Sequence, residues 1–148
     1  MTRFLTFAIL ALLPLLAWGE GYTCIEDMAT GFAYENGIWQ QVRFKLEGTF
    51  VIRPAMEFDQ NSWISIVLGI PKAKWGVGKL GEKEPIASCE YDFDTAGSLY
   101  CRASFYEFRM NRKSLRFLHA YLTGYWNSTP GDEAGDTPYI NIGKCSPM

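Results

Sequence analysis

The alternation of apolar and polar positions between Cys89 and Cys101 predicts a β-hairpin closed by its own disulfide. Side chains alternate between the two faces of a strand. With the two cysteines opposite each other, one face is apolar and consists of Cys89, Tyr91, Phe93, Leu99 and Cys101. The other face is mostly polar and consists of Glu90, Asp92, Ser98, Tyr100 and Arg102. A one-residue slip would mix the two sets, and residues 94–97 supply turn chemistry with Gly97 free to take a positive φ.

Short segments of similar pattern, separated by turn residues, occupy the rest of the chain. Turns are expected at Thr30-Gly31, at Asn36-Gly37 and at residues 111–114. The second strand of the hairpin is expected to continue from Cys101 to about Met110, with a bulge between Phe105 and Phe108. Further strands are expected at 22–28, 32–34, 38–46, 49–53, 63–68, 115–126 and 139–145.

Three segments are harder to assign. The nearly continuous apolar run from Trp63 to Leu68 predicts a central strand that is buried on both faces. Leu115 to Trp126 fits either a strand or a helix, and its aromatic content favours the strand. Gly69 to Pro85 is rich in glycine, proline and charge, and it is expected to form a long loop.

The pattern as a whole predicts an all-β fold of about eight or nine strands, either a small antiparallel barrel or a two-sheet sandwich. Four cysteines allow three disulfide connectivities. The hairpin favours Cys89–Cys101, which leaves Cys24–Cys145 to join the two ends of the domain. That second bridge would place the first and last strands side by side, which favours a closed barrel. A zinc site is disfavoured because the chain has no Cys-x-x-Cys pair and one histidine.

The N-terminus has the organisation of a secretory signal peptide. A short positive segment precedes an apolar run from Phe4 to Leu16, and Ala17-Trp18-Gly19 places small residues at a cleavage site. The run is too short to span a bilayer comfortably, which disfavours a membrane anchor. We therefore expect residues 1–19 to be a signal peptide and residues 20–148 to be a single exported β domain, periplasmic or extracellular, without stable membrane insertion after cleavage.

Composition and charge narrow the partners. The chain carries 14 basic and 16 acidic residues, for a formal net charge of −2. This balance disfavours nucleic acid, which needs a basic surface. Aromatic residues make up 16% of the chain, and exposed aromatic side chains mark protein or carbohydrate binding surfaces. Filling the core of a small barrel is the competing explanation for most of them.

The candidate binding residues come from the predicted loop and from single aromatic side chains. The loop holds Trp75, Lys74 and Lys79, a combination that suits an anionic or sugar-like partner. Trp39, on the polar side of its strand, and Trp126 are further candidates. Residues 76–81 match the G-x-G-x-x-G pattern of dinucleotide sites, but Pro85 would stop the helix which that motif requires. No cofactor is expected.

Catalytic and metal-binding motifs are weak. His119 is the one histidine, and no G-x-S-x-G nucleophile elbow accompanies it. Two acidic groups, at residues 90–94 and 132–136, would suit glycosidase or calcium chemistry only if their carboxylates converged. Residues 127–129 form an N-glycosylation sequon, which matters only in a eukaryotic secretory pathway. The metal and catalytic assignments therefore stay empty.

Three hypotheses for the function follow. The first is an exported, non-enzymatic binding or inhibitor-like module, whose partner is an envelope protein, a glycan or a small ligand. The second is a carrier that holds a small apolar ligand in the mouth of a barrel. The third is a small hydrolase that uses His119 or a pair of carboxylates. A pocket of about 300 Å³ or more would favour the carrier, and a filled barrel with an exposed tryptophan patch would favour the binding module.

Overall fold

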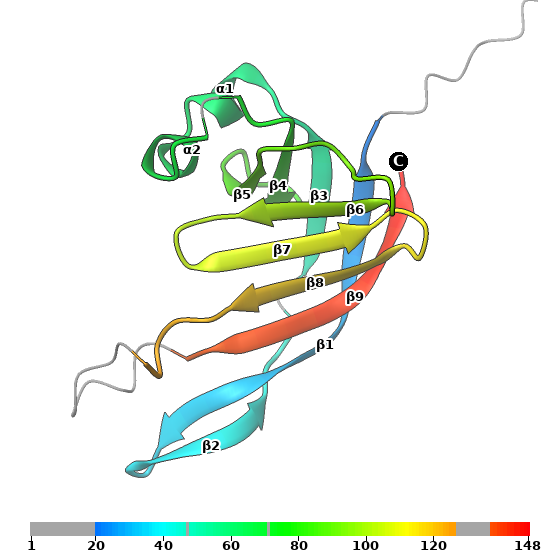
Figure 1. Ribbon diagram of the computed structural model, residues 1–148. Coiled ribbons are helices and arrows are strands. Elements are labelled where there is room, and N and C mark those ends of the chain that lie inside the picture. Colours follow the sequence, from blue (N-terminus) through cyan, green and yellow to red (C-terminus); the bar gives the residue numbers. More distant parts are fainter. Residues whose placement is uncertain (1–19, 47, 71, 127–136) are drawn as a thin grey trace, which may run out of the picture.

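Nine antiparallel strands form one sheet in the part of the chain that the computed structural model describes, and eight of them close into a barrel (Figure 1). The described residues are 20–46, 48–70, 72–126 and 137–148. The predicted signal peptide, the sequon and the second acidic group lie outside them. The strand order is β2-β1-β3-β4-β5-β6-β7-β8-β9, and β1 also pairs with β9. The predicted all-β fold is therefore confirmed, and the barrel is the correct alternative.

The elements follow one another along the chain with short connections. They are β1 (Tyr22–Glu35), β2 (Ile38–Arg43), β3 (Thr49–Pro54), α1 (Glu57–Gln60), α2 (Trp63–Val67), β4 (Trp75–Lys79), β5 (Pro85–Cys89), β6 (Ser98–Arg102), β7 (Tyr106–Asn111), β8 (Arg116–Tyr121) and β9 (Tyr139–Pro147).

Closure of the barrel depends on β1, which pairs with β3 on one side and with β9 on the other. Cys24 and Cys145 lie opposite each other in the β1–β9 pair and form a disulfide. The second disulfide joins Cys89 and Cys101. Both predicted bridges are therefore present, and the first and last strands are adjacent as expected.

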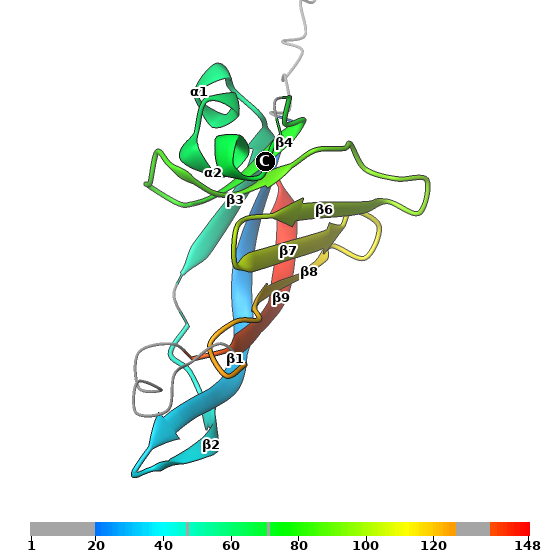
Figure 2. The ribbon, with the colours of Figure 1, turned by 60° about the vertical axis from the view of Figure 1, so that its left-hand side comes forward.

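A two-stranded arm made of β1 and β2 extends away from the barrel (Figure 2). Asn36 and Gly37 both have positive φ angles, of 53° and 84°, which is the geometry of the tight hairpin turn that Asn-Gly predicts. The predicted turn at Thr30-Gly31 is wrong, because β1 runs straight through it. Gly31 serves close packing instead: a Cβ there would collide with the carbonyl oxygen of Pro138.

The Cys89–Cys101 hairpin has the predicted register but is shorter than predicted. Ser88 pairs with Arg102, which places the two cysteines opposite each other. Gly97 has a φ of 87°, as the turn requires. Strand β5 ends at Cys89, and Tyr91 is exposed, so its predicted place on the apolar face is wrong.

Three other segments differ from the sequence-based expectation. Trp63 to Val67 forms helix α2 and not a strand, because the side chain of Ser62 accepts a hydrogen bond from the backbone N–H of Ser65 and starts a helix. The predicted loop at 69–85 contains β4. The predicted strand from Cys101 to Met110 reverses direction between β6 and β7, and no bulge is needed.

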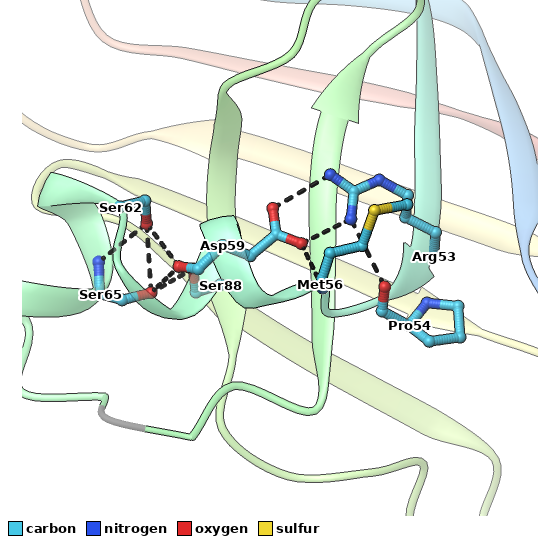
Figure 3. Close-up of polar contacts among 7 residues, drawn as sticks. All are labelled: Arg53, Pro54, Met56, Asp59, Ser62, Ser65 and Ser88. Carbon is cyan, nitrogen blue, oxygen red and sulfur yellow. Dashed lines mark hydrogen bonds and ion pairs between the residues drawn. The ribbon is translucent and has the colours of Figure 1, made fainter.

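Helices α1 and α2 cover the outer face of β3, β4 and β5 through a buried polar network (Figure 3). Arg53 donates two hydrogen bonds to the buried Asp59 carboxylate, at 2.5 and 3.0 Å. The hydroxyl groups of Ser65 and Ser88 lie 3.1 Å apart and connect α2 to β5. Gly76 leaves room for the Asp59 carboxylate, which lies 3.4 Å from the position of a Cβ. This network holds α2 beside the seam between β5 and β6.

Candidate functional site

Three buried polar side chains lie in the barrel lumen, near the end from which β9 starts. Glu26, His119 and Asn141 come from β1, β8 and β9 and are each almost fully buried. The Asn141 amide Nδ2 donates to Glu26 Oε1 at 2.5 Å, and the backbone N–H of Gly48 donates to Glu26 Oε2 at 3.2 Å. Buried polar groups are kept where hydrogen bonds satisfy them, so the carboxylate has a defined place in the lumen.

Aromatic rings surround His119. The Tyr106 ring stacks on the imidazole with 5.6 Å between the ring centroids and an interplanar angle of 24°. Tyr139 and Phe50 contact it edge-on, with centroid distances of 5.7 and 5.1 Å. His119 thus separates the packed core, which begins at Phe50 and Phe108, from the end of the barrel.

Two hollows open at this end of the lumen, which we name the barrel mouth. The first, the aromatic lobe, has a volume of about 430 Å³. It is lined mainly by apolar and aromatic side chains: Trp63, Ile64, Lys79, Pro85, Ile86, Ala103, Ser104, Phe105, Tyr106, His119 and Tyr139. The second, the polar lobe, has a volume of about 550 Å³ and includes Lys45, Thr137 and Asn141. Lys79 and Tyr139 line both lobes and form the boundary between them.

The mouth opens where the β5–β6 pairing is weakest. Ser88 and Arg102 are the one residue pair in register between these strands within the described residues. Beyond them the chain turns back, and the N–H of Ala103 donates to the carbonyl oxygen of Tyr106 at 2.9 Å. The start of β5 and the β6–β7 turn therefore bound the aromatic lobe without a ladder between them, and Ile64 from α2 lines the same space.

The predicted binding residues are distributed over three places. Lys79 lies at the barrel mouth. Lys74 is exposed and Trp75 is half-buried at the other end of β4, where Trp75 Nε1 donates to Asp92 Oδ1 at 2.9 Å. Trp39 lies in the arm, and its ring contacts Tyr125 edge-on at 5.3 Å. Trp126, the next residue after Tyr125, is exposed.

The carboxylates of the hairpin loop serve local structure. Asp92 accepts from the backbone N–H of Phe93 and from the Trp75 indole, and these two hydrogen bonds lower the pKa of its carboxyl group. Asp94 Oδ1 accepts from the backbone N–H of Ser98 and closes the turn. Glu90 faces Arg102 at 3.7 Å on the surface. The described residues contain no group of three acidic, histidine or cysteine side chains arranged to hold a metal ion.

Four lining residues of the mouth were missed by sequence reasoning, namely Glu26, Tyr106, Tyr139 and Asn141. Two of them had a readable signal. Glu26 shares the strand parity of Cys24, and Asn141 shares that of Cys145. Because a disulfide between paired strands points into the core, polar residues of the same parity are buried polar residues. Tyr106 and Tyr139 had no such signal, since they follow or precede loops of unknown length in space.

The fold and the mouth together define a small, disulfide-linked antiparallel barrel with an open, aromatic-walled end. No family model, curated protein or solved structure with which the chain was compared matches it. No helix among the described residues is long and apolar enough to cross a membrane. Function is therefore argued from the geometry of the mouth.

Proposed function

We propose that the protein is an exported, non-enzymatic binding protein that holds a small, mainly apolar ligand in the aromatic lobe of the barrel mouth. The observation that carries this proposal is the lobe itself. Its volume of about 430 Å³ lies within the range of roughly 300–1,000 Å³ that small-ligand sites occupy. This ranks the carrier hypothesis above a binding module built on exposed tryptophans.

The lining of the aromatic lobe suits a flat apolar molecule. Ile64, Pro85 and Ile86 supply an aliphatic wall, while Tyr106 and Tyr139 supply rings on which a planar ligand can stack. A few polar groups within an apolar wall fix the orientation of a ligand in such sites. Ser104 and His119 are placed to do this.

Export is supported by the covalent structure and the N-terminal sequence. Both disulfides are formed and no described cysteine is free, and disulfides persist in oxidising compartments. Residues 1–19 have the composition of a signal peptide. A ligand carrier in the periplasm or medium is consistent with both features.

A titration with naphthalene, 2-naphthol and indole tests the proposal, with binding followed by calorimetry and by tryptophan fluorescence. Ser104→Trp should fill the aromatic lobe and weaken binding at least about tenfold, a change of about 1.4 kcal/mol. Thr95→Trp, an exposed position in the hairpin turn, is the matched control and should bind as the wild type does. Absence of saturable binding, or equal binding by the filled variant, would contradict the proposal.

A second candidate function is recognition of a protein partner by the arm. The arm exposes Phe32 and Ile38, and Trp39 joins them to Tyr125 and the exposed Trp126. Strand β2 pairs with β1 alone among the described strands, and an unpaired strand edge is a template for another strand. A photo-crosslinking residue at position 38 should then capture one specific partner in the producing cell, whereas one at position 83 should not.

A further inference from the structure

The outer face of β8 and β9 presents a cationic row beside an apolar row. In the β8–β9 register, Arg116 lies opposite Lys144. Two residues further along, Leu118 lies opposite Ile142, and Ile142 in turn lies opposite Met28 of β1. Because residues i and i+2 of a strand share a face, the two rows are neighbours on the outside of the barrel.

The cationic row is electrostatically unfavourable in the protein alone. Like charges that lie directly opposite each other in a sheet lower its stability. Within the described residues, neither Arg116 nor Lys144 has a carboxylate within 4 Å. Arg109, on the next strand, has its own partners: Glu107 at 3.0 Å and the ring of Tyr100 at 5.0 Å from the ring centroid. An anion between Arg116 and Lys144 would relieve their repulsion.

The apolar row is exposed. Met28 is 52% exposed and Ile142 is 44% exposed, and Ile25, which lies opposite Lys144, is 60% exposed. Both rows border an open groove of about 850 Å³, in which Asp27 is the one carboxylate among the lining residues. The groove is distinct from the mouth, since its lining shares no residue with either lobe.

We propose that this outer groove binds a single-chain anionic amphiphile. Its phosphate or carboxylate head lies between Arg116 and Lys144, and its hydrocarbon chain lies along Leu118, Ile142 and Met28. The local positive charge, on a chain of net charge −2, complements the anionic head. The concave shape favours one molecule seated in the groove over the flat surface of a bilayer. Binding here is independent of the ligand in the mouth.

Calorimetric titration of the mature protein with monomeric octyl phosphate tests this site. Octanol and inorganic phosphate, each of which supplies half of the amphiphile, should bind at least about tenfold more weakly. Lys144→Gln and Arg116→Gln should each weaken octyl phosphate about tenfold. Without ligand, each should raise the melting temperature by about 1–4 °C, because the like-charge pair is removed. Lys83→Gln, an exposed lysine before β5, should change neither quantity.

Each contrary outcome overturns a defined part of the proposal. Equal affinity for octanol would remove the anion from the site, and equal affinity for inorganic phosphate would remove the hydrocarbon chain. An equal loss in Lys83→Gln would show non-specific charge attraction. Loss of octyl phosphate binding in Ser104→Trp would place the amphiphile in the mouth. Binding to vesicles that contain anionic phospholipid, without binding to monomeric octyl phosphate, would show that the groove recognises a membrane surface.

Discussion

The two ends of the barrel lumen differ in chemistry although the same strands build both. At one end, Phe108 and Phe117 stack with 5.2 Å between their centroids, and both disulfides join neighbouring or facing strands. Phe93, from the hairpin loop, packs between Tyr22 and Trp75 and covers this end. We refer to it as the sealed end.

At the barrel mouth, the inward positions change to polar and aromatic residues within one or two steps along each strand. Phe117 is followed by His119 on β8, and Cys24 is followed by Glu26 on β1. Close packing and covalent links stabilise a fold, whereas a binding site needs space and groups that are not fully paired with each other. The difference indicates that stability and function are separated along the barrel axis.

Removing the disulfides of the sealed end should have the largest effect on stability. In the chain-entropy description, closing 121 residues with Cys24–Cys145 contributes about 5 kcal/mol, whereas closing 12 residues with Cys89–Cys101 contributes about 3 kcal/mol. Replacing each pair by alanine, and measuring urea unfolding, should therefore destabilise the first variant by about 2 kcal/mol more than the second. Equal losses would mean that native packing, and not chain closure, sets the contribution of each bridge.

Truncation of a ring should next distinguish the two ends. Phe108→Ala leaves a cavity among fully buried rings and should cost about 3–5 kcal/mol of unfolding free energy. Tyr106→Ala, two residues away on the same strand and face, removes a half-buried ring at the mouth and should cost about half as much or less. The same Tyr106 variant should weaken ligand binding in the aromatic lobe. Equal destabilisation by the two variants would contradict the division of the lumen.

How far the sequence predicts this division depends on which residues set each end. The sealed end was largely predictable, because Cys89, Leu99 and Cys101 fix a register and a buried face by parity alone. Cys24 and Cys145 then bring the termini of the domain together. Strand alternation and disulfide pairing are local or pairwise signals, and both can be read from the chain.

The mouth was not predicted because its wall comes from departures from regular pairing. Trp63 and Ile64 reach it only because a short apolar run forms a helix, and periodicity cannot distinguish a buried strand from such a helix. Residues 103–105 reverse the chain without glycine, proline or asparagine to mark a turn. Lys79 was chosen as a loop residue and reached the mouth as the end of β4. Its role in binding remains a prediction.

The hydrogen bond between Asn141 and Glu26 sets the third expected effect. Asn141→Ala removes a donor from a buried carboxylate and should lower the unfolding free energy by about 1–3 kcal/mol. Asn111→Ala, at the tip of β7, is a half-exposed control that loses hydrogen bonds which water can replace, and it should cost less. Urea unfolding of both variants provides the comparison. A smaller loss for Asn141→Ala would show that the mouth tolerates an unpaired carboxylate, as a solvated cavity would.

The smallest expected effect belongs to Asp92, a surface contact at the rim of the sealed end. Its carboxylate accepts from the Phe93 N–H and the Trp75 indole, which lowers the pKa of Asp92 in the folded state. A depressed carboxyl pKa adds stability above the ordinary aspartate value of about 3.9. That contribution disappears as the pH falls through the lower folded pKa. We therefore expect a slight decrease of the melting temperature below about pH 4, with a change in Trp75 fluorescence over the same range. Asp92→Asn should lack the fluorescence transition while its mouth binds ligand as the wild type does, since the contact lies at the other end of β4. A transition that persists in Asp92→Asn would assign the titration to another carboxylate and remove Asp92 from the account of the sealed end.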